Sequence, residues 1–161
     1  MTKLLDTKTR EKLINYLNSR FGIEKDFFRD YLFTISGHSV SIISQSRETR
    51  KIIEQLLYRN YVNGFGIELF SNFKDYTPSS LGFGLFKAGE IMHNSVTFSR
   101  EQANDYFKGK DISSKDAIKI NTLSSGYIIC IFNSQIIGTA NFDKQSQMIK
   151  PNLSFVNTKI K

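Results

Sequence analysis

Apolar residues recur at helical spacing in two stretches of the first half of the chain. Asp6 can cap a first helix and Gly22 can end it in the left-handed conformation. The apolar positions of this helix share one face: Leu13, Ile14, Leu17 and Phe21. A second amphipathic helix begins at Ser46, with four positions predicted inward: Ile52, Ile53, Leu56 and Leu57. Both helices therefore need a packed surface to cover their apolar faces.

β-prone segments accompany these helices. Tyr31–Ser36 and Ser39–Ser44 are separated by Gly37-His38, which predicts a hairpin. Glu24–Asp30 is predicted to form a further helical turn. Val62–Ser71 alternates like a strand, although its two glycines weaken it or mark a bulge. Together these elements predict an α+β module of about 80 residues.

The pattern changes after Thr77-Pro78. Leu81–Phe86 fits either a strand or a helical turn. One helix is predicted at Arg100–Phe107, capped by Ser99 and followed by Gly109. Short strands surround it: Ser95–Phe98, Ala117–Asn121, Tyr127–Asn133, Gln135–Phe142 and one around Gln147–Ile149. Tight turns such as Asn133-Ser134 join them, so this half predicts a small closed or nearly closed β-barrel.

Composition places the chain among globular proteins. Its 161 residues are 40% hydrophobic and 23% charged, enough for one domain or two small ones. A single cysteine excludes a disulfide framework and multi-cysteine zinc or iron–sulfur sites. The longest apolar runs fall far short of the roughly 20 residues of a membrane span. The first residues are charged where a signal peptide is apolar, so we expect a cytoplasmic protein without a membrane partner.

Positive charge is spread along the whole chain. The formal charge is +7, of which +3 falls before residue 83 and +4 after it. Lys144–Lys161 contains four lysines and no carboxylate, so it cannot neutralise itself. Nucleic-acid phosphate is the usual anionic partner of such a protein. A solubilising surface is the alternative interpretation.

The second half resembles a PUA domain, an RNA-binding barrel, on two segments: SREQANDYFKGKDI (Ser99–Ile112) and SGYIICIFNSQIIGTANF (Ser125–Phe142). The matching features are a small residue on the helix (Ala103), the glycine that opens a strand (Gly126), and Ile137-Gly138 in the next strand. The resemblance implies an RNA-binding barrel over residues 83–161.

The whole chain is similar to the two-domain Nip-seven family of ribosome-biogenesis factors. Three segments carry this likeness: FTISGHSVSIISQSRETRKIIEQL (Phe33–Leu56), LGFGLFKAGE (Leu81–Glu90) and IKPN (Ile149–Asn152). The resemblance implies a pre-PUA domain at 1–82 before the PUA domain at 83–161. Ser146 and Gln147 replace paired arginines of that family, and Pro151 is inserted. A related domain pair ends some RNA cytosine methyltransferases.

Lys108-Gly109-Lys110 is the sharpest local candidate for RNA contact. A glycine lets the backbone approach a phosphate, and the flanking lysines supply charge. The resemblance adds four neighbours: Lys87, Arg100, Lys150 and Lys159. For each lysine alone a solvated surface position is the preferred interpretation, and the lysines support RNA contact only as a set. A closed barrel has no free edge, so binding is expected through loops, helix ends and charged side chains.

Aromatic residues could also stack on RNA bases. Core packing is the preferred interpretation for five of them: Phe86, Phe98, Phe107, Phe132 and Phe142. Tyr106 and Tyr127 suit a wet surface better, because they carry a hydroxyl group.

No catalytic, metal or cofactor pattern is present in the sequence. His38 and His93 have no third histidine or other ligand at metal-binding spacing. Cys130 lies in an apolar strand, which predicts a buried and inert thiol. Gly64-Phe65-Gly66 and Gly82-Phe83-Gly84 lack the third glycine of a dinucleotide site.

The sequence therefore predicts a non-catalytic RNA-binding protein without a cofactor. The resemblance points to ribosomal RNA maturation, with ribosomal RNA and ribosome-assembly proteins as partners. Two alternatives remain open: a protein–protein adaptor that uses the aromatic-rich stretch Tyr58–Phe73, and an accessory subunit that presents RNA to a separate modifying enzyme.

Overall fold

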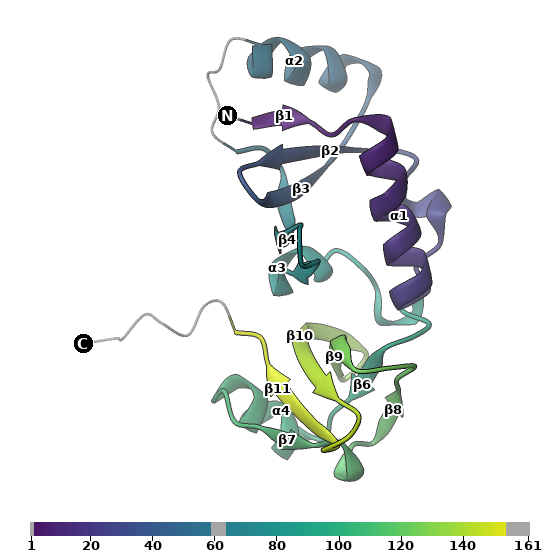
Figure 1. Cartoon of the computed structure of the whole chain (residues 1–161), viewed down its shortest axis with the longest axis vertical. Helices are drawn as coiled ribbons and strands as arrows, with labels where there is room; N and C mark the ends of the chain where they lie inside the picture. Colours follow the sequence, from purple (N-terminus) through teal and green to yellow (C-terminus); the bar gives the residue numbers. More distant parts are fainter. Residues whose placement is uncertain (1, 59–63, 154–161) are drawn as a thin grey trace, which may run out of the picture.

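The computed structural model of the chain describes residues 2–58 and 64–153. In these ranges the protein is a mixed α+β structure built on two sheets, each formed by one half of the sequence (Figure 1). None of the helices in the described ranges is long and apolar enough to cross a membrane.

The first sheet is antiparallel, in the order β1-β2-β3-β4-β5. Its strands are β1 (Thr2–Leu4), β2 (Tyr31–Ser36), β3 (Ser39–Ser44), β4 (Ile67–Asn72) and β5 (Thr77–Pro78). The predicted β2–β3 hairpin is confirmed, and Gly37 turns it at φ 60°. β4 begins later than predicted, and residues 62 and 63 of the predicted strand lie outside the described residues.

Two helices and a 3-10 turn accompany this sheet. They are α1 (Thr7–Phe21), η1 (Lys25–Phe28) and α2 (Arg47–Tyr58). Asp6 accepts the Thr9 N–H at 2.9 Å, and Gly22 ends α1 at φ 71°, so both predicted ends of α1 are confirmed. The inward position of Ile52 is wrong: its side chain is 56% exposed, whereas Ile53 is buried. Adjacent helical residues point about 100° apart, so Ile52 leaves the apolar face that Ile53 occupies.

The second sheet has the strand order β7-β11-β10-β9-β6-β8 and curls into a half-barrel. Its strands are β6 (Ser95–Thr97), β7 (Ile112–Ser113), β8 (Lys119–Asn121), β9 (Gly126–Phe132), β10 (Gln135–Asp143) and β11 (Met148–Pro151). β6 and β9 run parallel, and the other pairs are antiparallel. Since β7 and β8 end the order of the described strands, hydrogen bonds between these strands do not close the sheet. The expectation of a barrel without free edges is therefore wrong.

The helix of the second half matches its prediction. α4 (Arg100–Phe107) is capped by Ser99, whose hydroxyl accepts the Gln102 N–H at 3.3 Å while the Gln102 side chain accepts the Ser99 N–H at 3.1 Å. This reciprocal capping is a local signal, readable from sequence. A 3-10 turn, η3 (Ser114–Asp116), occupies the space before β8, so the predicted strand there begins two residues late.

Helix α3 (Ser80–Phe83) joins the two halves, and the predicted boundary at 82/83 falls inside it. Gly82 lies so close to the β4 backbone that a methyl group there would meet the Glu68 carbonyl oxygen. Phe83 and Phe86 are buried in the first core cluster together with Ile129 of β9. The first core therefore extends into the second half, and the two sheets share packed side chains.

Candidate functional site

The outer face of the second sheet is polar beside its β8 edge. Ser95 and Thr97 of β6 point outward, while Val96 between them is buried in the second core cluster. The register places Lys119 of β8 opposite Thr97, which in turn lies opposite Ile131 of β9. Because side chains alternate along a strand, these residues share one face.

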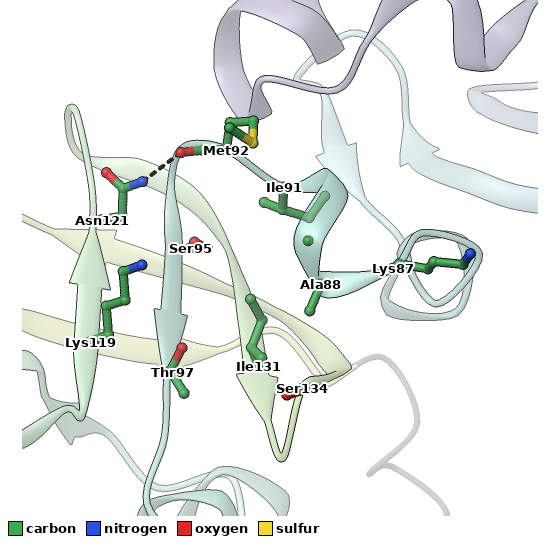
Figure 2. Close-up of a pocket in the computed structure, with 11 residues that line it drawn as sticks. Lys87, Ala88, Ile91, Met92, Ser95, Thr97, Lys119, Asn121, Ile131 and Ser134 are labelled. Carbon is green, nitrogen blue, oxygen red and sulfur yellow. Dashed lines mark hydrogen bonds between the residues drawn. The ribbon is translucent and has the colours of Figure 1, made fainter.

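A short 3-10 turn, η2 (Ala88–Glu90), rises beside this face and makes it concave (Figure 2). The hollow has a volume of about 680 Å³. Lys119 extends from the strand side, and Lys87 lies on the turn across the hollow, with its side chain directed outward (Figure 2). Asn121 also lines the hollow and donates to the Met92 carbonyl, which ties β8 to the segment after η2.

A second hollow of about 700 Å³ continues the first toward the start of α4. The two share Thr97 and Ser134, and the second adds Arg100, Ile118 and Phe132. We call the two hollows together the groove. The Asn133-Ser134 turn forms part of its wall, and both residues adopt positive φ, 48° and 61°, as in the tight hairpins that join antiparallel strands.

Among the described residues that line it, the groove has cations and no carboxylate. Lys87, Lys119 and Arg100 are all exposed. Glu90 belongs to the same turn as Lys87, but it accepts the Lys87 backbone N–H at 2.7 Å and lines an adjoining cavity of about 440 Å³, which shares Gly89 and Met92 with the first hollow. The charge of the groove is therefore available to an anion.

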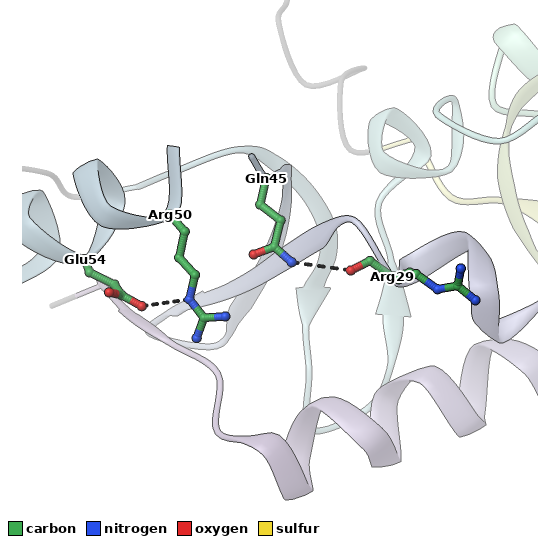
Figure 3. Close-up of polar contacts among 4 residues, drawn as sticks. All are labelled: Arg29, Gln45, Arg50 and Glu54. Carbon is green, nitrogen blue, oxygen red and sulfur yellow. Dashed lines mark hydrogen bonds and ion pairs between the residues drawn. The ribbon is translucent and has the colours of Figure 1, made fainter. Parts of the chain in front are cut away.

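Two other arginines of the described chain are paired with acidic side chains. The Arg29 guanidinium lies 2.9 Å from the Asp26 carboxylate, and Arg50 Nε donates to Glu54 at 2.9 Å. Figure 3 shows the second pair beside Gln45, whose amide donates to the Arg29 carbonyl at 3.3 Å. An anion near Arg29 or Arg50 would meet a carboxylate as well as a guanidinium group. An anion in the groove would meet cations without a described lining carboxylate.

The Lys108-Gly109-Lys110 segment lies at the far end of α4 from Arg100, about 12 Å away at 1.5 Å per residue. Gly109 has the predicted left-handed conformation, at φ 71°. Lys110 Nζ is 2.9 Å from the Asp105 carboxylate, so one of the two charges is compensated. The structure does not bring this segment into the groove.

Lys150, another predicted lysine, is also outside the groove. Lys150 is exposed on β11, opposite Asn141 of β10. Its charge helps to lower the pKa of the Asp143 carboxyl, although the hydrogen bond from the Ser146 hydroxyl contributes more. Lys159 lies outside the described residues. Of the predicted site, the structure therefore brings together Lys87 and Arg100.

Sequence reasoning missed Lys119, because its role depends on pairing across the sheet. The alternation of Lys119 and Asn121 was the local signal, but only the β6–β8 register shows that Lys119 faces Thr97.

The sequence analysis also misplaced two aromatic residues. Phe107 is 56% exposed, and Tyr106 is fully buried with its hydroxyl donating to the Thr139 carbonyl at 2.9 Å. Phe86, Phe98 and Phe142 are buried as predicted.

Two groups buried in the second core have raised pKa values. Cys130 is buried, as predicted, and burial raises the pKa of its thiol. Burial also raises the pKa of the Tyr106 hydroxyl. Both groups therefore stay protonated and uncharged inside the second core. Among the described residues, no group of three or more histidine, cysteine or acidic side chains could hold a metal ion.

Comparison with known proteins adds no relative: no family model matches the chain, and no curated protein matches it.

Proposed function

We propose that this chain is a non-catalytic RNA-binding protein that holds RNA phosphates in the groove. The observation that carries the proposal is the charge pattern of the groove, where Lys87, Arg100 and Lys119 line two joined hollows without a lining carboxylate. Lysine and arginine bind phosphates and release the counterions that surround them. The formal charge of +7 adds long-range attraction.

The PUA resemblance is a second support. Ala103 of α4 is buried in the second core, Gly126 opens β9, and Gly138 of β10 contacts the Tyr106 hydroxyl closely enough to leave no room for a side chain. In the resemblance they are the small helical residue, the glycine that opens a strand and the glycine of the next strand. We therefore propose a pre-PUA domain at 1–82 and a PUA domain at 83–161. The proposed role is cytoplasmic ribosomal RNA maturation beside ribosome-assembly proteins.

The experiment is an RNA titration by fluorescence anisotropy over a salt series. The test variant is Lys87→Gln/Arg100→Gln/Lys119→Gln, and the control is Lys8→Gln/Lys12→Gln/Lys25→Gln, which removes three charges from exposed positions on α1 and η1. If each groove cation contacts one phosphate of a single strand, the test variant loses about 2 from the slope of log affinity against log salt, at roughly 0.7 per contact.

The control variant is expected to retain most of the slope. Equal losses in both variants would show that net charge alone attracts RNA and would remove the groove from the proposal. Wild-type protein without RNA affinity at low salt would overturn the function itself. A polyglutamate competitor completes the test, because a groove that accepts it as well as RNA recognises anions without regard to the sugar and base.

Exposed apolar side chains on α2 favour a second candidate, the adaptor. Tyr58 is 89% exposed and Ile52 is 56% exposed. In the aromatic-rich stretch 58–73, however, Leu69 and Phe70 are buried core residues. Pull-down from lysate with and without nuclease separates the candidates, since partners bridged by RNA are lost on nuclease treatment. An accessory subunit for an RNA-modifying enzyme would keep a protein partner and also bind RNA.

A further inference from the structure

The Arg100 end of the groove differs from the Lys87 end in having aromatic residues beside its cation, among the described lining residues. Phe132 is half-buried: its side chain packs against the second core and also lines the groove. Ile118, from the segment before β8, is 69% exposed and lines the same hollow. The Ile118 backbone is held in place, because its N–H donates to the Thr97 carbonyl at 3.0 Å.

This combination distinguishes an unpaired strand from a duplex. In a duplex the bases are stacked on each other, so a protein surface meets mainly phosphates, sugars and base edges. An exposed apolar surface beside a guanidinium group would then stay in contact with water. An unpaired base can turn away from its neighbours and cover that surface with its own ring.

We propose that the Arg100 end of the groove seats one unpaired base of a single-stranded RNA, stacked on Phe132 and covered at its edge by Ile118. Lys119 and Lys87 then hold phosphates of the neighbouring nucleotides. Three backbone steps separate Thr97, which faces Lys119, from Arg100, so the Cα atoms of Thr97 and Arg100 lie within about 10 Å of each other. This inference rests on the proposed function and narrows it to single-stranded RNA.

The test compares three probes: hexaadenylate, a hexanucleotide of the same phosphates and sugars without bases, and a twelve-base-pair RNA duplex. For the wild-type protein, we expect hexaadenylate to bind on the order of tenfold more tightly than the base-free strand, which corresponds to one stacked base. The duplex is expected to bind no better than the base-free strand.

The central variant is Phe132→Leu, which keeps apolar volume and removes the aromatic face. It is expected to bring hexaadenylate close to the base-free strand while leaving affinity for the base-free strand unchanged. The matched control is Phe107→Leu, an exposed aromatic at the other end of α4, which is expected to change neither. A 2-aminopurine base in the strand adds a direct signal, because its emission falls when the base stacks on Phe132.

A gain-of-function variant guards against a folding defect in Phe132→Leu. Ile118→Trp changes an exposed side chain and enlarges the stacking surface, so it is expected to tighten hexaadenylate several-fold without tightening the base-free strand.

The results also separate the two proposals. Equal binding of hexaadenylate and the base-free strand, both with a steep salt dependence, would overturn the stacking site and leave RNA binding intact. Stronger binding of the duplex would do the same. Binding of none of the three probes would overturn the proposed function.

Discussion

The hydroxyl of Ser80 in α3 accepts the backbone N–H of Thr139 in β10 at 3.1 Å. The same hydroxyl donates to the Asn152 carbonyl at 3.2 Å, and the Asn152 amide donates to the Pro78 carbonyl at 3.1 Å. Residues from both halves of the chain therefore satisfy one another's polar groups at the junction. Lys87 follows α3 closely in the chain, so the junction also positions the Lys87 side of the groove.

Gly138, next to this junction, has little room for a side chain. A methyl group there would lie 2.2 Å from the Tyr106 hydroxyl oxygen, and φ is 150°, a conformation that side chains disfavour. We expect Gly138→Ala to lower the free energy of unfolding by more than ~2 kcal/mol, measured by urea denaturation.

Two further variants test whether that loss of stability comes from the contact between Gly138 and Tyr106. Gly138→Ala/Tyr106→Phe removes the nearest atom and is expected to recover part of the stability. Gly64→Ala is the matched control, since a methyl group there meets nothing within 4 Å. A Gly138→Ala protein as stable as wild type would contradict the close packing.

Arg20 is expected to be a second stabilising residue of the junction. Its guanidinium donates to the Tyr127 carbonyl at 2.9 Å and to the Ser124 hydroxyl at 2.6 Å, so the end of α1 is bound to the start of β9. Hydrogen bonds from charged groups contribute about 1.5–3 kcal/mol each. We expect Arg20→Met to cost about 2–3 kcal/mol and Arg20→Lys to recover little, because lysine lacks the planar fork.

The control for Arg20 is Arg29→Met. Arg29 forms an exposed pair with Asp26, 71% and 80% exposed, and such pairs contribute between about 0 and 1 kcal/mol. Equal effects of the two substitutions in thermal and urea unfolding would show that the Arg20 contacts do not stabilise the fold.

The groove and the Lys108-Gly109-Lys110 segment are expected to contribute unequally to RNA binding. Lys87→Gln/Lys119→Gln removes charge from a site without a lining carboxylate, whereas Lys108→Gln/Lys110→Gln removes charge where Asp105 already compensates Lys110. We expect the first pair to reduce the salt slope by about 1.4 and the second to reduce it by less than half as much. The reverse order, measured by anisotropy, would move the RNA site to the end of α4.

Stability is expected to fall at alkaline pH. Burial raises the pKa of the Cys130 thiol, so the folded protein keeps a proton that the unfolded chain releases above about pH 8.5. The full stability is present below that pH and declines by about 1.4 kcal/mol per pH unit above it for one such group. Tyr106 adds a similar decline above about pH 10, for the same reason.

Urea unfolding at pH 7.5 and at pH 10 measures this decline. Cys130→Ala is expected to show a smaller difference between the two pH values than the wild-type protein. The native thiol is also expected to react with a thiol reagent only as fast as the protein unfolds. Rapid reaction at pH 8, or an unchanged pH dependence in the alanine variant, would contradict a buried, protonated thiol.

The sequence allowed prediction of elements whose signals are local. Asp6 and Gly22 define α1, Ser99 and Gln102 define the start of α4, and Asn133-Ser134 defines a hairpin. Each signal acts through hydrogen bonds or backbone angles within a few residues. The mixed α+β class and most strands follow from these signals together with apolar alternation.

Features that depend on distant partners were not predictable in this way. β1 is three residues long and exists because Thr2, Lys3 and Leu4 pair with the outer side of β2. Burial of Tyr106 depends on the missing side chain of Gly138, more than 30 residues later. Lys119 enters the groove through its pairing with β6. Local patterns contain no information about which distant residues will meet.

The edge strands of the half-barrel affect whether copies of this chain associate with one another. An unfinished sheet offers unused backbone donors and acceptors to any neighbouring strand. Among the described strands the edge strands are β7 and β8, which are only two and three residues long, and β8 contains Lys119. Brevity and a like charge on every molecule disfavour stacking of one copy against the next. The ammonium group that would attract a polyanion would thus also keep identical molecules apart.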